Sequence, residues 1–345
     1  MSFTLKLEML RCNIFLLILG LASICMVWQP ASGIDDAALA ERFARGAERG
    51  DPIAQNNLGA LYLKGRGVEQ NYATAIGWFQ KAAESGLAGA FFNLGMVHLR
   101  GYGVDPDVAA ANERLTTSAH LGDRDAQFFL GLHYYQGTGF EKDLENAKLW
   151  FRRAADQGAP AAMYNLGILY LDPDPAISDE SQALAWLDKA SQENYPGTEL
   201  VIAKVHLSHT EDQARVALGA EQYKNLAASN NLDAQIQLGM MYTFGQGVEQ
   251  NYDEGRFWLE RAASQGSSQA QLNLGNLFAE GLGVEKHLPR ALAWYSIGAE
   301  NNDPAATQNA ILLSEQLKKD ERQEAEAIRQ ELEAKFGGGL YNKFE

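Results

Sequence analysis

Hydrophobic positions recur with a fixed period along most of the chain. Residues 54–64 (AQNNLGALYLK) place Leu58 and Tyr62 four residues apart with Gly59 beside them, which puts an apolar face on an α-helix. Steps of 36 residues from Gly59 reach a small residue each time: Gly59, Gly95, Gly131, Gly167, Ala203, Gly239 and Gly275. Trp78 recurs at the same spacing as Trp150, Trp186, Trp258 and Trp294. A period of this length, held over seven copies, predicts a repeat architecture.

Each copy predicts two helices joined by a turn. The first helix ends at a Gly-x-Gly pair, because glycine readily adopts the positive φ that closes a helix. The second helix is expected to start at a recurring capping position, occupied by Asn71, Asp107, Asp143, Asp179, Arg215, Asn251 and His287. Four residues later there is always Ala or Gly, which predicts that the two helices approach closely there. The hexapeptide GVEQNY, present at 67–72 and again at 247–252, is therefore a turn and a cap.

The pattern A-x-x-x-L-G-x-x-Y-x-x-G-x-G-V, followed by a capping residue and A-x-x-W, resembles the Sel1-like repeat, a relative of the tetratricopeptide repeat. The resemblance extends over about residues 37–306. It implies an all-α fold, an α/α superhelical solenoid, and a protein that scaffolds other proteins. Three copies depart from the pattern: Arg114 replaces the Trp, residues 172–180 (DPDPAISDE) replace the glycine turn, and residues 204–215 keep little of the consensus.

The ends of the chain predict additional segments. We expect a signal peptide at 1–33, an N-terminal capping helix at 34–53, seven repeats at 54–305, C-terminal capping helices at 306–336 and a flexible tail at 337–345. The apolar run 14–27 is too short to span a bilayer, which takes about 20 residues, and small residues 31–33 follow it. An uncleaved anchor is the alternative interpretation.

Cysteine usage bears on the compartment. Cys12 and Cys25, the only cysteines, both lie in the predicted signal peptide, so the mature chain would hold no disulfide. The sequence also has no Asn-x-Ser/Thr glycosylation site. We therefore expect a bacterial periplasmic protein without stable membrane insertion once the signal is cleaved, with secretion as the alternative.

Candidate chemistry is sparse. The Gly-x-Gly pairs follow helices and lack a phosphate-loop ending, so they are expected to be turns. His206 and His209 have the spacing of two metal ligands, but His206 falls on the aromatic position of the repeat and no third ligand accompanies the pair. We therefore predict no catalytic residue, no metal, no cofactor and no enzymatic activity. A formal net charge of −15 makes nucleic acid a poor partner.

The resemblance also implies where a partner would bind, since the first helices of such repeats line the concave side. Positions three before, one after and four after the repeat glycine form one stripe. We call the following residues the apolar stripe and predict that they contact a partner: Phe92, Met96, Leu99, Phe128, Leu132, Tyr135, Tyr164, Ile168, Leu171, Ile236 and Met240. The stripe fades in the first copy, at Asn56, Ala60 and Leu63, and in the last. An open groove for a protein or peptide and a packed core both remain as interpretations.

The resemblance and the apolar stripe lead to two hypotheses about function. The first is an exported scaffold or adaptor that binds a protein or peptide partner through an apolar concave groove, in envelope regulation, secretion or surface-polymer export. The alternative is an accessory factor that binds cell-wall glycan or a small molecule, or a hydrolase. A β-lactamase-like branch of the family is disfavoured, because that branch carries a disulfide in each repeat. Convergent polar and ionisable side chains in the groove would favour the alternative, whereas the stripe is apolar.

Overall fold

The structure is a computed structural model in which residues 35–336 are described. Over this range it contains helices α2 to α18 and no strand, which confirms the all-α repeat fold. The chain forms two compact units, one up to Ala162 and one from Met163 onward, and each is described separately. The predicted signal peptide and tail lie outside the described residues. No helix in the described part is long and apolar enough to cross a membrane.

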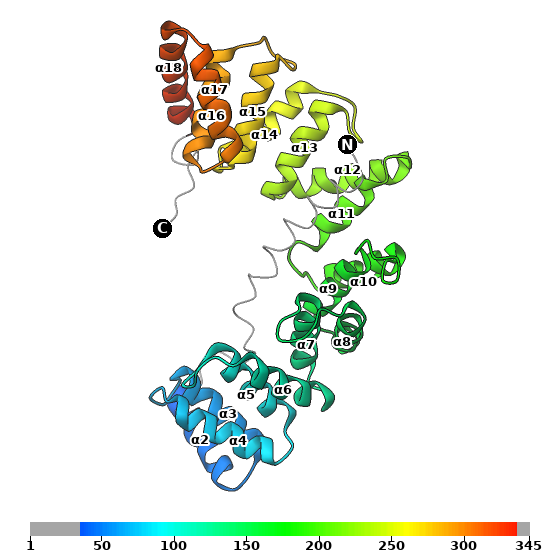
Figure 1. Cartoon of the computed structure of the whole chain (residues 1–345), viewed down its shortest axis with the longest axis vertical. Coiled ribbons are helices and arrows are strands. Elements are labelled where there is room, and N and C mark those ends of the chain that lie inside the picture. The colour runs from blue at the N-terminus through cyan, green and yellow to red at the C-terminus, as the bar shows by residue number, and fades with distance from the viewer. Residues whose placement is uncertain (1–34, 337–345) are drawn as a thin grey trace. The chain divides into compact units, whose positions relative to one another are not determined.

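In its described residues, the N-terminal unit is built from one single helix and three antiparallel helix pairs (Figure 1). Helix α2 (Asp36–Glu48) is the first of these and packs on α3. The three pairs are α3 (Pro52–Lys64) with α4 (Tyr72–Glu84), α5 (Ala88–Arg100) with α6 (Val108–His120), and α7 (Arg124–Gln136) with α8 (Leu144–Asp156). The unit boundary falls inside α9 (Pro160–Tyr170).

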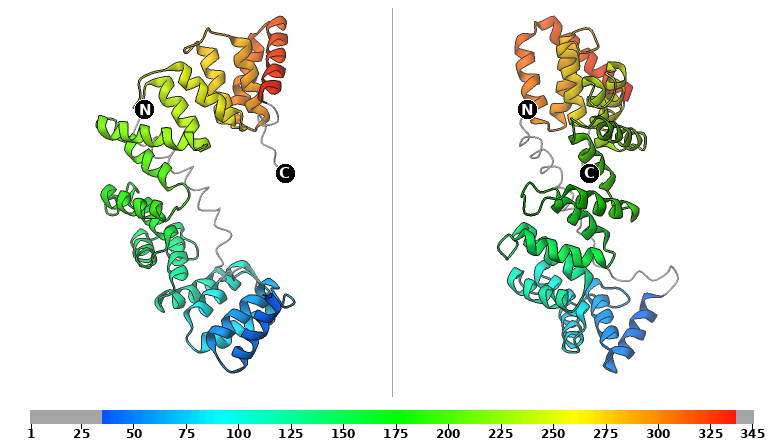
Figure 2. Two further views of the ribbon diagram at one scale, coloured as in Figure 1. Left: turned by 180° about the vertical axis from the view of Figure 1, so that it is seen from behind. Right: turned by 90° about the vertical axis from the view of Figure 1, so that its right-hand side faces the viewer.

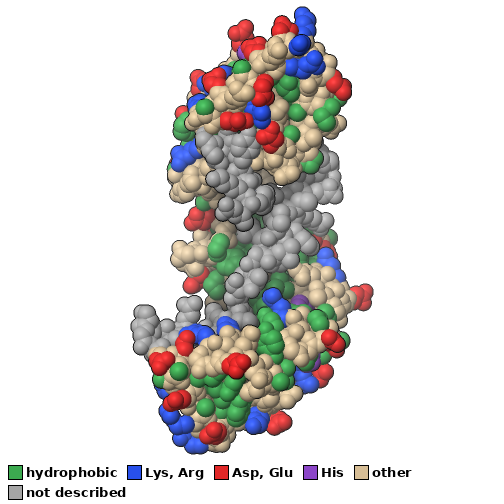
Figure 3. Space-filling view, turned by 90° about the vertical axis from the view of Figure 1, so that its left-hand side faces the viewer, with side chains coloured by type: hydrophobic (Ala, Val, Ile, Leu, Met, Phe, Trp, Pro, Cys, Tyr) green, Lys and Arg blue, Asp and Glu red, His purple; other side chains and the backbone are tan. Residues whose placement is uncertain are grey.

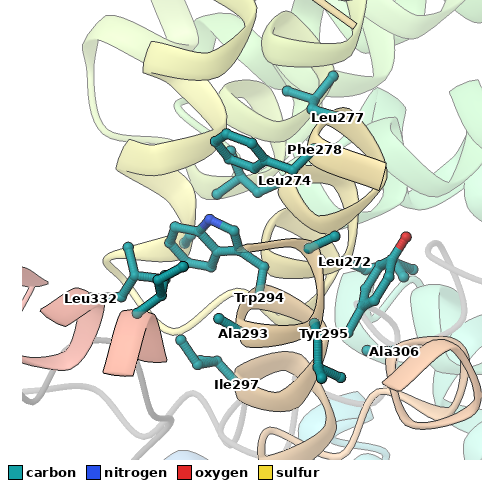
Figure 4. Close-up of a cluster of buried hydrophobic side chains, with 14 of the residues drawn as sticks. Leu272, Leu274, Leu277, Phe278, Ala293, Trp294, Tyr295, Ile297, Ala306 and Leu332 are labelled. Carbon is teal, nitrogen blue, oxygen red and sulfur yellow. The ribbon is translucent and has the colours of Figure 1, made fainter. Parts of the chain in front are cut away.

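The C-terminal unit continues the same pattern of pairs (Figure 2). After α9 come α10 (Glu180–Gln192), α11 (Thr198–Ser208), α12 (Gln213–Ala228), α13 (Leu232–Phe244), α14 (Tyr252–Ala263), α15 (Ser268–Glu280) and α16 (Leu288–Glu300). Two further helices, α17 (Pro304–Gln316) and α18 (Lys319–Phe336), pack on α16. Leu332 of α18 approaches the buried side chain of Trp294 in Figure 4, so α18 covers the last repeat.

In six of the seven first helices a glycine lies where the partner helix comes closest, and α11 has Ala203 there. A Cβ atom added at Gly59 would lie 2.7 Å from the Phe79 ring and 3.0 Å from the carbonyl oxygen of Ala75. At Gly239 the same atom would lie 2.7 Å from Leu259. These distances are below normal contact, so a side chain at Gly59 or Gly239 would clash with the partner helix.

Predicted caps are present in six of the seven pairs. The side chains of Asn71, Asp107, Asp143, Asp179, Asn251 and His287 accept a backbone amide at the start of the second helix. The prediction for Arg215 is wrong. Helix α12 begins earlier, at Gln213, and the side chain of Asp212 accepts the amides of Ala214 and Arg215. Arg215 instead forms an ion pair with Glu180 at 2.6 Å.

Candidate functional site

The apolar stripe is largely core in the N-terminal unit. Phe92, Met96, Phe128 and Leu132 are each exposed by 9% or less. The ring of Phe92 lies 5.7 Å from that of Phe129, and the ring of Phe128 lies 6.0 Å from that of Phe151. Leu99 and Tyr135 are half-buried.

The C-terminal unit shows the same arrangement. Tyr164 and Ile168 are buried, while Leu171, Ile236 and Met240 are half-buried. The burial of these six stripe positions supports packed core, the second of the two interpretations, because their side chains fill the space beside the neighbouring helices. A partner contact at the half-buried positions stays a prediction.

A hollow occurs instead at the first repeat, where the apolar stripe is interrupted by Asn56 and Ala60. A cavity of about 460 Å³, here called the N-terminal pocket, opens between α2, α3, α5 and the start of α7. Its apolar lining comes from Leu39, Phe43, Ala60, Leu61, Leu63 and Phe92. Its polar lining comes from Arg42, Asn56, Asn57, Lys64, Arg66, Asn93, Asp123 and Asp125. Its volume falls in the range of about 300–1,000 Å³ that is common for ligand sites.

Small residues at two repeat positions create this space. Ala60 stands where the next three repeats have Met96, Leu132 and Ile168. Gly89 lines the pocket at a position where the next repeat has Asp125. A Cβ atom at Gly89 would meet only Asn56 Nδ2 and Asp123 Oδ2, each at 3.9 Å, so the pocket stays open above this glycine.

Two asparagines from adjacent repeats fix the polar face of the pocket. Asn93 Nδ2 donates a hydrogen bond of 2.8 Å to Asn56 Oδ1. This bond leaves Asn56 Nδ2 as a donor and Asn93 Oδ1 as an acceptor, and neither has a further hydrogen bond within the described residues. An amide donor beside an amide acceptor matches the N–H and C=O groups of a peptide backbone.

Charges divide the pocket into two ends. Asp123 caps α7 through Oδ1, and burial together with the neighbouring Asp125 raises the pKa of its carboxyl group. At the other end Arg66 is bound to Asp36 at 2.7 Å. Arg42 and Lys64 are exposed and form no ion pair with any described residue. On the face shown in Figure 3, charged side chains of both signs are scattered over the N-terminal unit at the bottom.

The two histidines considered as metal ligands have other partners. His206 Nδ1 is hydrogen-bonded to Gln222 at 2.9 Å, and His209 contacts the carboxylate of Glu180. Gln222 stands at the Trp position of its repeat, so a polar pair replaces an aromatic one there. Within residues 35–336, no three His, Cys, Asp or Glu side chains form a cluster that could hold a metal ion.

The sequence pattern alone does not predict the N-terminal pocket. Asn56, Ala60 and Leu63 lie on the same three stripe positions, and their polarity and small size indicate only that the stripe fades. The signal for the pocket is the loss of volume at Ala60 and Gly89 beside α2, which lies one period of 36 residues before α4 and has no first helix paired with it among the described residues.

The Sel1 repeat model matches residues 52–87, 90–123, 124–158, 160–195, 232–267 and 268–303. The crystal structure of c5321, a protective antigen present in uropathogenic Escherichia coli strains and displaying an SLR fold, is 28% identical with a TM-score of 0.68. That similarity covers 89% of this chain and 66% of the antigen, so the chain spans just under two thirds of the antigen's length.

A second similar structure is a Sel1 repeat protein from Oxalobacter formigenes, with 29% identity, a TM-score of 0.51, and coverage of 67% of this chain and 97% of that one. Comparison with curated proteins gives no significant match. The interval between residues 195 and 232 has no match to the repeat model, although α11 and α12 form a helix pair there. With more than half of its residues matched, the chain belongs to the Sel1 repeat family, whose repeats mediate protein–protein interactions.

Proposed function

We propose that the protein is an exported scaffold or adaptor that binds a protein or peptide partner at the N-terminal pocket. The observation that carries this proposal is the pairing of an apolar lining with the Asn56–Asn93 amides, whose remaining donor and acceptor have no partner among the described residues. Polar groups that are left open in a hollow gain hydrogen bonds when a ligand enters it. The partner site therefore moves from the buried part of the apolar stripe to the end where the stripe fades.

The lining favours binding over catalysis. None of the described residues that line the pocket is His, Ser, Thr or Cys, so no hydroxyl or thiol nucleophile beside a histidine base is found among them. The two carboxylates, Asp123 and Asp125, are occupied in part by the α7 amide and by Arg124.

A glycan or small polar molecule is the second candidate, because the pocket is more polar than the apolar stripe. Sugar sites commonly present an open aromatic face against which the ring packs. Phe92 is only 7% exposed and Phe43 is half-buried, so neither ring presents a fully open face. We therefore favour a peptide over a glycan as the ligand.

We further propose that the protein acts in the cell envelope, in regulation, secretion or surface-polymer export. The predicted signal peptide supports this location. N-terminal sequencing of the exported protein should give a start close to Ile34, and recovery of Met1 in a membrane fraction would contradict it.

Site-specific photocrosslinking tests the binding face. A photoreactive amino acid at Asn57, which is half-buried and lines the pocket, should capture a specific protein in cells. The same amino acid at Glu84, which is exposed at the end of α4 and outside the pocket, serves as the control. Equal capture from both positions, or capture from Glu84 alone, would refute the pocket as the binding site.

A further inference from the structure

We infer that the occupant of the N-terminal pocket is an extended peptide segment with an acidic side chain at one end and a basic side chain at the other. This inference rests on the proposed function and adds the chemistry of the ligand. Three observations carry it: the order of charges along the pocket, the amide pair between them, and the length of the path.

The basic end is formed by α2 and the C-terminal end of α3. Arg42 and Lys64 are exposed and have no ion-pair partner among the described residues, whereas the nearby Arg66 is already neutralised by two hydrogen bonds to Asp36. The whole chain carries a net charge of −15, so two unpaired cations on one rim are a local reversal of sign. An acidic side chain is the complementary group.

The acidic end is formed by the start of α7. Asp123 Oδ1 accepts the amide of Ala126, which leaves Oδ2 directed toward the space at Gly89. Asp125 lines the same end and is paired with Arg124 at 3.3 Å, whereas burial, and to a lesser degree the nearby Asp125 carboxylate, raise the pKa of Asp123. Asp123 forms no ion pair with a described residue, so a lysine or arginine side chain beside its Oδ2 would stabilise the ionised carboxylate.

The middle of the pocket suits the backbone of a peptide ligand rather than one of its side chains. Asn56 Nδ2 lies within 3.9 Å of the position that a Gly89 side chain would occupy, and Asn93 holds the Asn56 amide in place through its 2.8 Å hydrogen bond. Because Gly89 has no side chain, a peptide unit can approach α5 closely at this point.

The path fits a short extended peptide. Asn56 and Lys64 are eight residues apart on α3, which corresponds to about 12 Å along the helix. A Cβ atom at Gly89 would lie 3.9 Å from both Asn56 Nδ2 and Asp123 Oδ2, so these two atoms are no more than about 8 Å apart. The path from Lys64 past Asn56 to Asp123 is therefore about 20 Å, which holds about six residues of extended chain.

Heptapeptides with blocked termini provide the test on the full-length mature protein. The probes are Asp-Ala-Val-Ala-Val-Ala-Lys, its reversed sequence, a version with Lys at both ends and a version with Ala at both ends. We expect one of the two mixed-charge peptides to bind with a Kd of about 1 mM or below by NMR titration, and the Ala version to bind roughly tenfold more weakly.

Reversing the charge at the basic end of the pocket should change which peptide the protein prefers. In the double variant Arg42→Glu, Lys64→Glu both ends of the pocket are acidic, so the preference should switch by roughly tenfold to the peptide with Lys at both ends. The control Arg49→Glu, Arg100→Glu changes the net charge equally at two exposed positions outside the pocket and should leave the wild-type preference intact.

Three results would overturn the inference: no binding of either mixed-charge peptide up to about 5 mM, equal binding of the Ala version, or the same switch in the control. These results are distinct from a failure of the proposed function. If the photoreactive amino acid at Asn57 still crosslinks a protein while the peptides show no charge preference, the pocket binds a partner of other chemistry. If position 57 captures no protein, the proposed function itself fails.

Discussion

Asn112 and His133 form a buried polar pair between α6 and α7. Both side chains are exposed by 5% or less, and His133 Nδ1 contacts Asn112 Oδ1. Asn112 Nδ2 donates to the carbonyl oxygen of Thr138 at 3.0 Å, which ties the pair to the turn after α7. Burial lowers the pKa of His133 to about 4, so the imidazole is neutral in the folded protein at pH 7.

Acid should therefore destabilise the protein through His133. The unfolded chain takes up a proton near the ordinary pKa of 6.5, whereas the folded state does so only near pH 4. The stability is thus fully present above pH 6.5 and is lost as the pH falls toward 4, by up to about 3 kcal/mol. Urea unfolding at pH 7.5 and 4.5 should show a smaller loss in His133→Gln than in wild type. Equal losses would contradict the buried neutral histidine.

Phe128 and Leu132 allow a second test on single residues, which asks whether the apolar stripe is core. Both are core residues of the N-terminal unit, so the double variant Phe128→Asp, Leu132→Asp would bury two unpaired carboxylates and cost several kcal/mol. We expect a strongly lowered melting temperature by circular dichroism. The matched control is Leu121→Asp, Leu149→Asp, at positions that are 51% and 45% exposed, and it should melt nearly as wild type does. An unchanged melt of the core variant would mean that the stripe is open.

Among the elements, α12 shows how a repeat adapts when its consensus is lost. The 36-residue spacing places a cap at Arg215, but Asp212 can accept two amides and arginine can accept none, so the helix starts one turn earlier. Residues 172–180, which lack the glycine turn of the repeat, adapt in a similar way. There Asp172 and Asp174 each accept a nearby backbone amide in place of the glycine turn.

Removal of the Asp212 cap should loosen α12. We expect Asp212→Ala to cost about 1 kcal/mol and to speed hydrogen exchange over residues 213–216. Glu211→Ala, an exposed change one residue earlier that removes no cap, should have little effect. Similar acceleration in both variants would show that the cap does not hold the helix start.

The elements could be predicted far better than the site. Helix pairs, positive-φ residues such as Gly65 and Asn194, and six caps follow from residue type at fixed spacing, because each depends on contacts within one repeat. The pocket depends on missing volume at Ala60 and Gly89 and on the placement of α2, a second helix of the repeat that has no paired first helix among the described residues. A spacing pattern assigns positions to a face, but it does not tell whether neighbouring side chains are long enough to fill that face.

For the whole molecule, the two units have different terminal elements. Within residues 35–336, the first helix of the N-terminal unit is the single helix α2, beside which the pocket opens, whereas α17 and α18 cover the last pair of the C-terminal unit. Terminal repeats of a solenoid need such atypical elements, since each inner repeat is covered by its neighbours. In this protein we assign the N-terminal end the additional task of binding.

The measurement that tests this assignment most directly compares how much of the photocrosslinked partner protein is captured by two variants. The test variant is Gly89→Leu and its control is Gly77→Leu. Both glycines lie in helices, and an added Cβ meets only ordinary contacts at Gly89 and no atom within 4 Å at Gly77. Replacing glycine in a helix stabilises it by up to about 1 kcal/mol, so both variants should melt at or above the wild-type temperature. The leucine at position 89 fills the pocket and should reduce capture at least about tenfold, whereas Gly77→Leu should capture as wild type does. Wild-type capture by a folded Gly89→Leu would contradict the pocket as the binding site.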